Sequence, residues 1–291
     1  MIAAVKSATP TLTHVIPSQG KNGVSAVTSL GDDVFVARQN CNQQVEVYDA
    51  VTLTLQRRIT VSGLGTWPYY AIQLSTGDYV GLAACPNNKC LYASDYGEDR
   101  VYRVKLSGSN AVKKWSVASS PRGLSVNSEQ NLIVSCLEAS KLQEYTTHGS
   151  LVREICLHAG VTQSWPYHAI QLSTGDYVVS QNTSPGVVSV VGVDGQIVRS
   201  YGQSETSDAG HMKRPTSLAV TKNDDILVVG KGNTGILLIN SSVGSIQEMA
   251  LSVDGGMHGP RGLCLDESRG RLYIGELDGD CRMLVFDGVY V

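Results

Sequence analysis

A short pattern recurs six times along this 291-residue chain: a small hydrophobic strand, a tight polar turn, and a second strand that ends on small residues. The six instances are Val27 with 34–37, Leu82 with 91–94, Leu124 with 132–135, Ile170 with 177–180, Leu218 with 227–230, and Leu263 with 272–275. Successive first-strand hydrophobes are 55, 42, 46, 48 and 45 positions apart. A period in this range is typical of radial β-repeat architectures, in which each repeat forms one small sheet.

The third unit shows the strands most clearly. Period-two alternation and turn residues predict strands at 123–126, 132–135, 141–145 and 151–157. A single four-stranded meander cannot bury both of its faces, so the six sheets must pack around a common axis. We therefore predict an all-β fold, a six-bladed β-propeller of four-stranded antiparallel blades.

The last unit runs short of chain. After the strand at 281–286 only 287–291 remain for a fourth strand, whereas 12–17 forms a strand with no partner of its own. We predict that this N-terminal strand completes the sixth blade, which leaves no open sheet edge. The chain then consists of an N-terminal tail, 1–11, and one propeller domain, 12–291.

Composition and charge narrow the function classes. The net charge of −3 and pI of about 6.1 give no global attraction to nucleic acid or to an anionic membrane. Residues 1–10 lack the apolar core of a signal peptide, and no window approaches the roughly 18 apolar residues that span a bilayer. We expect a monomeric, cytoplasmic protein that does not enter a membrane.

The seven cysteines are an odd number scattered through a large chain, which favours reduced thiols over a disulfide framework. Cys85 and Cys90 flank a turn that should place them opposite each other on adjacent strands. No second ligand pair has the spacing of a zinc site, so we predict two small buried thiols, and no metal or cofactor.

In the second unit, a strand at 91–95 ends in Asp95 and is followed closely by Arg100 and another strand. The openings at 121–124, 214–218 and 260–263 share a Pro-x-Gly/Ser-Leu form. These features resemble the NHL repeat, and the resemblance covers 12–291. At the hallmark Asp position the six units have Arg38, Asp95, Cys136, Gln181, Lys231 and Glu276.

NHL propellers often form the C-terminal target-recognition module of TRIM-NHL ubiquitin ligases, where they bind proteins or RNA. The resemblance therefore implies a non-catalytic interaction scaffold. The sequence has no Cys/His series spaced for a RING domain and no heptad run for a coiled coil. Ligase activity would then come from a partner or from a longer gene product.

One segment departs from the repeat pattern. The sequence at 67–80 recurs at 165–178 with 13 of 14 positions identical, and the one change is Tyr70 to His168. The copy creates two candidate first strands for the second unit, around Ile72 or around Leu82. We favour Leu82, because 81–106 contains a complete unit, so 67–80 becomes an inserted hairpin. The alternative is a five-stranded blade.

In a meandering blade, the loops that lead into each first strand lie on the same face as the loops between second and third strands. We call this the first-strand face. Its charges are mixed with a slight acidic excess, while aromatic residues gather near its loops: Trp67, Tyr69, Tyr70, Trp165 and Tyr167. Trp, Tyr and Arg dominate binding hot spots. We predict that a protein or peptide binds through Arg122, Tyr167, His168, Arg214, Arg261, Trp165, Arg38 and Lys231.

Two alternatives stay open. One is binding of single-stranded RNA on the same face. The other is a metal-dependent hydrolase or lactonase with oxygen ligands in the central channel. Asp95 and Glu276 are the acidic members of the hallmark set, but Lys231 and Arg38 would compete with a cation there. No Ser-His-Asp set or paired-His motif has a supporting spacing, so we assign no catalytic residues.

Overall fold

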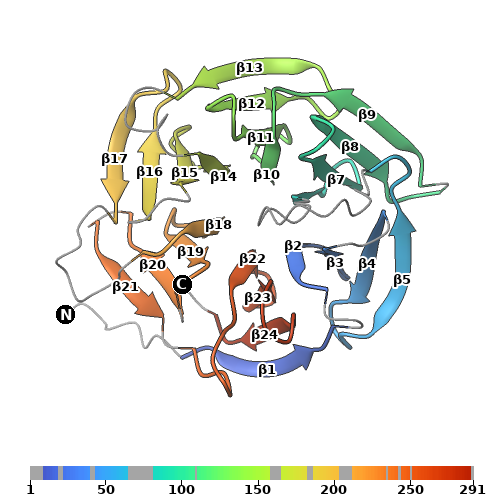
Figure 1. The fold of residues 1–291 in the computed structure, drawn as a ribbon, viewed down its shortest axis with the longest axis vertical. Coiled ribbons are helices and arrows are strands. Elements are labelled where there is room, and N and C mark those ends of the chain that lie inside the picture. Colours follow the sequence, from blue (N-terminus) through green and yellow to red (C-terminus); the bar gives the residue numbers. More distant parts are fainter. Residues whose placement is uncertain are drawn as a thin grey trace, which may run out of the picture.

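Six four-stranded antiparallel sheets form a closed ring in the computed structural model (Figure 1). The structure describes residues 9–18, 22–39, 43–64, 81–108, 110–157, 165–181, 186–202, 212–233, 235–241, 244–249 and 251–289. The first strand of each blade lies near the axis and the last strand at the perimeter. The predicted six-bladed β-propeller is confirmed.

The blades follow one another along the chain. Blades 1 to 3 consist of β2 (Val24–Leu30), β3 (Asp33–Arg38), β4 (Gln44–Asp49), β5 (Leu55–Thr60); β6 (Leu82–Cys85), β7 (Cys90–Asp95), β8 (Arg100–Lys105), β9 (Val112–Ser116); and β10 (Pro121–Val126), β11 (Leu132–Cys136), β12 (Lys141–Tyr145), β13 (Leu151–Cys156). Blades 4 to 6 consist of β14 (Pro166–Gln171), β15 (Tyr177–Gln181), β16 (Val187–Val191), β17 (Ile197–Tyr201); β18 (Pro215–Val220), β19 (Ile226–Gly230), β20 (Ile236–Ile239), β21 (Ile246–Met249); and β22 (Pro260–Asp266), β23 (Arg271–Glu276), β24 (Met283–Asp287), β1 (Thr11–Ile16).

The N-terminal strand closes the ring as predicted. β1 pairs antiparallel with β24, from Thr11 opposite Asp287 to Ile16 opposite Met283. Ile16 is buried in the cluster between blades 6 and 1, and Leu12 packs against the cluster between blades 5 and 6. The strand therefore removes the free edge of β24 and adds to two inter-blade cores.

The hydrophobic core lies between adjacent blades. The second strands β11, β15 and β19 are buried along their whole length because a neighbouring sheet covers each face. One cluster joins Phe35 of blade 1 to Leu91 and Tyr102 of blade 2. Another joins Leu227 of blade 5 to Phe286 of blade 6. Each sheet thus depends on both neighbours, as expected for a radial repeat.

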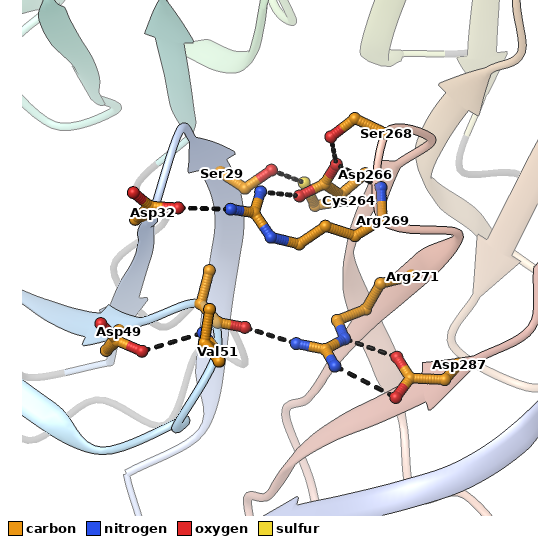
Figure 2. Close-up of polar contacts among 11 residues, drawn as sticks. Ser29, Asp32, Asp49, Val51, Cys264, Asp266, Ser268, Arg269, Arg271 and Asp287 are labelled. Carbon is orange, nitrogen blue, oxygen red and sulfur yellow. Dashed lines mark hydrogen bonds and ion pairs between the residues drawn. The ribbon is translucent and has the colours of Figure 1, made fainter.

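Polar contacts reinforce the seam between blades 6 and 1 (Figure 2). The Arg269 guanidinium donates to Asp266 at 2.9 Å within its own blade and to Asp32 of blade 1 at 2.5 Å. Arg271 binds both carboxylate oxygens of Asp287, and it donates to the carbonyl of Ala50 across the seam. The Arg271 hydrogen bonds hold the pKa of Asp287 below its ordinary value.

Among the described residues blade 2 begins with β6, so the predicted first strand around Leu82 is confirmed. Cys85 and Cys90 are register partners and buried free thiols, as predicted. The segment 67–80, with its four aromatic residues, lies outside the described residues. The inserted hairpin therefore stays a prediction. The second copy, 165–178, builds β14 and the turn into β15.

Candidate functional site

A β-bulge recurs at the start of the first strands. The register shifts just after Val24, Pro121, Pro166, Pro215 and Pro260, each of which pairs with the last residue of the second strand. Proline is tolerated at the first position of a strand, and a bulge turns a side chain away from the regular alternation. The residues that follow are Ser25, Arg122, Tyr167, Thr216 and Arg261. All five are buried, at 6 to 8% exposure. They form a ring that we call the bulge ring.

The bulge ring lines a cavity of about 70 Å³ on the propeller axis. All described lining residues belong to the starts of the six first strands, which places the cavity at the end of the channel nearer the first-strand face. Among these described lining residues none is Asp or Glu, whereas two are arginines. The described part of this wall therefore carries two guanidinium groups and no carboxylate.

Two arginines from opposite blades converge on one tyrosine. Arg122 of blade 3 donates from Nη1 to the Tyr167 hydroxyl at 2.5 Å, and Arg261 of blade 6 donates from Nη2 to the same oxygen at 3.2 Å. The two donating nitrogens are within about 6 Å of each other, where two like charges repel by about 3 kcal/mol at an effective dielectric constant near 20. The first strands that carry them face each other across the ring (Figure 1).

The same side chains are also in cation–π contact. The Arg122 guanidinium carbon lies 4.7 Å from the ring centre of Tyr96 and 4.4 Å from that of Tyr167. Arg261 lies 5.3 Å from the Tyr167 ring centre. Cation–π contacts between a guanidinium and an aromatic face are favourable and hold the planar group in a fixed orientation. We call Tyr96, Arg122, Tyr167 and Arg261 the Arg–Tyr cluster.

His168 lines the channel beside this cluster. His168 directly follows the bulge-ring residue Tyr167. The residues that follow the other four members of the bulge ring are all small: Ala26, Gly123, Ser217 and Gly262. The imidazole Nε2–H donates to the Leu124 carbonyl at 3.1 Å, and Nδ1 accepts from the Leu218 amide at 3.0 Å. Both ring nitrogens therefore bind backbone groups of blades 3 and 5, which fixes the neutral Nε2–H tautomer.

Burial lowers the pKa of His168 to about 4, and the hydrogen bond to Leu124 only partly opposes this. In the unfolded chain the pKa of His168 is about 6.5, so the folded protein has its full stability above that pH, where the side chain is neutral in both states. The stabilisation is lost as the pH falls from 6.5 toward 4. Between pH 7 and pH 5 the loss should be about 2 kcal/mol.

We expect the His168→Gln variant to lack this component of the pH dependence, and His148→Gln, which alters an exposed turn residue, to retain it. Thermal unfolding of the three proteins at half-unit pH steps from 7.5 to 5 checks this. Parallel melting-temperature profiles for all three proteins would contradict the assignment.

The eight residues predicted to bind a partner fall into three groups. Arg122, Tyr167, His168 and Arg261 meet at the cavity. Trp165, Arg214 and Lys231 are exposed, with Trp165 at 59%, so this Trp does not fill a gap between blades. Lys231 pairs with Asp278 at 3.1 Å.

Arg38 lies apart from the cavity and forms the third group by itself. It is buried, pairs with Glu46 at 2.8 Å, and donates to the carbonyl of Cys281 at 3.0 Å. Its contacts join blade 1 to blade 6, so its position fits a structural role better than ligand binding.

The hallmark positions do not line the described cavity, contrary to our expectation for the channel mouth. They end the second strands, one strand away from the axis. Asp95 accepts hydrogen bonds from the amides of Gly97 and Glu98 in the following turn. Glu276 is fully buried and forms an ion pair with Arg282 at 2.6 Å.

Sequence reasoning missed three members of the site: Ser25, Thr216 and Tyr96. A usable signal was present for Thr216, because Pro215 aligns with the prolines before Arg122, Tyr167 and Arg261. Ser25 has no proline before it. Tyr96 comes from the loop between β7 and β8 and reaches Arg122 only through the packing of blade 2 against blade 3.

Within the described part of the chain, no group of three or more His, Cys, Asp or Glu side chains has an arrangement that could hold a metal ion. No described helix is long and apolar enough to cross a membrane.

No protein-family model and no curated protein matches the sequence. The fold is similar to many solved structures. A streptogramin B lyase has a TM-score of 0.63 and 16% identity, over 94% of this chain and 96% of that one. A catalytically inactive variant of virginiamycin B lyase from Staphylococcus aureus, solved with quinupristin, has a TM-score of 0.62 and 12% identity, over 94% and 98%.

A third similar structure is the hydrazine synthase of Kuenenia stuttgartiensis, with a TM-score of 0.61 and 16% identity, over 99% of this chain and 80% of that one. At these identities the likeness shows the propeller fold. The NHL-repeat resemblance is not confirmed by any of these comparisons.

Proposed function

We propose that this protein is a non-catalytic binding module that takes a protein or peptide on its first-strand face and anchors it at the Arg–Tyr cluster. The observation that carries the proposal is the convergence of Arg122 and Arg261 on the Tyr167 hydroxyl at the end of the channel. Arg and Tyr provide large, rigid contact areas with directional donors, and such residues in desolvated pockets dominate binding energy. The exposed Trp165 extends the surface toward the rim.

A metal-dependent hydrolase is less well supported. The cavity wall carries two guanidinium groups, which would repel a divalent cation. The one histidine among the described lining residues uses both ring nitrogens for backbone hydrogen bonds, so it is not placed to act as a base or a ligand. The two arginines and the engaged histidine in the cavity wall favour binding of a ligand over catalysis.

RNA binding is the second alternative, and the rim argues against it. Exposed acidic residues on the first-strand face are Glu98, Glu138, Asp254, Asp278 and Asp280, against the exposed Lys213, Arg214 and Lys231. Nucleic-acid affinity comes mainly from many phosphate contacts, which an acidic rim opposes. Two arginines deep in a small cavity cannot supply those contacts.

The NHL resemblance would give this surface a target-recognition role in a ubiquitin-ligase-type protein. We therefore include in the proposal that this binding module recognises targets for a protein of that type. Monomeric state and cytoplasmic location are further parts of the proposal.

Selection from a random-peptide display library on the immobilised full chain tests the proposal. We expect enriched peptides whose affinity falls at least fivefold in Tyr167→Phe, which removes only the shared acceptor, and at least tenfold in Trp165→Ala. The control Val198→Ser changes an exposed residue on the outer strand of blade 4 and should bind the peptides unchanged.

Peptides that bind equally well to the wild type, Tyr167→Phe and Trp165→Ala would contradict the proposed surface. In the same assay format, an unstructured single-stranded RNA should bind only in the non-specific range of about 10⁻⁴ to 10⁻⁶ M at physiological salt. Nanomolar RNA affinity with sequence preference would favour the RNA alternative instead.

A further inference from the structure

The chemistry of the cavity identifies the group that it takes. We propose that the bulge ring is a carboxylate site, which receives one acidic group of the bound peptide between Arg122 and Arg261. This inference rests on the proposed function and specifies the anchoring group. A carboxylate can come from an Asp or Glu side chain or from a chain terminus, and both present the same planar pair of oxygens.

Charge and geometry favour an anion at this point. Both guanidinium groups donate to the Tyr167 hydroxyl, and a negative group seated between them would be attracted by two positive charges. The Tyr96 and Tyr167 rings both contact the Arg122 guanidinium, which limits its movement. A rigid planar fork matches the two oxygens of a carboxylate in a bidentate pair.

A second observation points to the same ligand. Ser25 is one of the residues that line this cavity, and its hydroxyl is buried with no hydrogen-bond partner among the described residues. Ser25 as a whole is 7% exposed. A buried hydroxyl without a partner is unfavourable in the unliganded protein, and an oxygen atom of a ligand could accept a hydrogen bond from it. Residues with hydrogen-bond donors from blades 1, 3 and 6 thus line the same cavity.

Size limits the ligand further. The volume of about 70 Å³ equals roughly two water molecules in the liquid, which fits the tip of a side chain and excludes a folded segment. The acidic rim opposes a chain of many negative charges. A single carboxylate on an otherwise neutral or basic peptide satisfies both conditions.

Small probes test this site apart from any peptide. The full-length protein is titrated with the α-amide of N-acetyl-aspartic acid, with N-acetylglycine, and with inorganic phosphate, followed by NMR chemical shifts at constant ionic strength set with potassium chloride. We expect a dissociation constant of about 1 mM for at least one carboxylate, as is usual for a fragment of this size. The first probe reports a side-chain carboxylate and the second a terminal one.

Matched variants separate binding from folding. Ser25→Ala should weaken the carboxylate about fivefold without lowering the melting temperature, because it removes a buried hydroxyl that has no described partner. Ser135→Ala is its control: that hydroxyl is also buried without a described partner, but it does not line the cavity. Arg261→Gln should weaken binding at least tenfold, while Lys113→Gln, at an exposed residue on the outer strand β9, should leave it unchanged.

The outcomes distinguish the two proposals. Phosphate binding more tightly than both carboxylates, carboxylate binding that is equal in Ser25→Ala and Ser135→Ala, or no saturable binding overturns the carboxylate site. The carboxylate site would also be overturned if the acidic residue of the selected peptides can be replaced by its amide without a loss of affinity. The peptide-binding function would stand in that case. Carboxylate binding with no selected peptides would support the site and overturn the peptide function.

Discussion

Deletion of residues 1–18 should lower the melting temperature by roughly 7 °C, because the lost strand β1 leaves β24 as an open edge. The deletion removes the buried Ile16, the packing of Leu12, and the ladder of hydrogen bonds to β24. Burial of the two side chains and the lost backbone pairing together stabilise the fold by about 4 kcal/mol. Differential scanning calorimetry of the deleted and the complete chain measures the effect.

Two point variants in β1 provide a sharper comparison. Ile16→Asp places a charge in the core between blades 6 and 1 and should approach the effect of the deletion. Val15→Asp changes the neighbouring residue, which is 44% exposed and points away from that core, and should alter the melting temperature little. Equal effects of the two substitutions would show that β1 does not pack against β24 in this register.

The Gly123→Ala variant should be destabilised by about 3 kcal/mol, because the new methyl group meets backbone and not a movable side chain. A Cβ atom at this position would lie 2.6 Å from both the Cα of His168 and the carbonyl oxygen of Tyr167. Relief requires the first strands of blades 3 and 4 to separate, which also disturbs the His168 hydrogen bonds. Denaturant unfolding gives the free-energy difference.

Gly262→Ala is the matched control, since both glycines stand in the same Pro-Arg-Gly-Leu sequence. A Cβ atom there would be 3.2 Å from the Val27 amide nitrogen, a contact that a small shift relieves. The expected change is within about 1 kcal/mol, because alanine also reduces the freedom of the unfolded chain. A similar loss of stability in both variants would mean that the sequence motif, and not the neighbour across the channel, determines the cost.

Most of the fold followed from local pattern. The six first-strand hydrophobes, from Val27 to Leu263, all lie in first strands, and the unpaired strand near the N-terminus does close the last blade. Strand alternation, turn residues and repeat spacing are properties of neighbouring residues, so they can be read along one chain. The competing positions for the second unit were resolved correctly for the same reason, because 81–106 contains a complete unit.

The site was predictable only in part. Arg122, Tyr167 and Arg261 were recognised as aromatic and basic residues near the loops, but their meeting at one hydroxyl depends on side chains from blades 3, 4 and 6. Arg38 has the same residue type and was predicted beside them, yet it pairs with Glu46 inside the seam between blades. Arg38 ends a second strand, whereas Arg122 and Arg261 follow the register shift at the start of a first strand, which is the strand nearest the axis.

The sequence alone determined the number of blades, the strands within them and the closing strand, because each depends on periodicity and on turn chemistry over short distances. The tertiary structure alone decided that His168 lines the channel with both nitrogens engaged, and that the bulge ring places two arginines, a tyrosine, a serine and a threonine around one small cavity. Ring closure brings together residues nearly a hundred positions apart, such as Tyr167 and Arg261, and no local pattern records that distance.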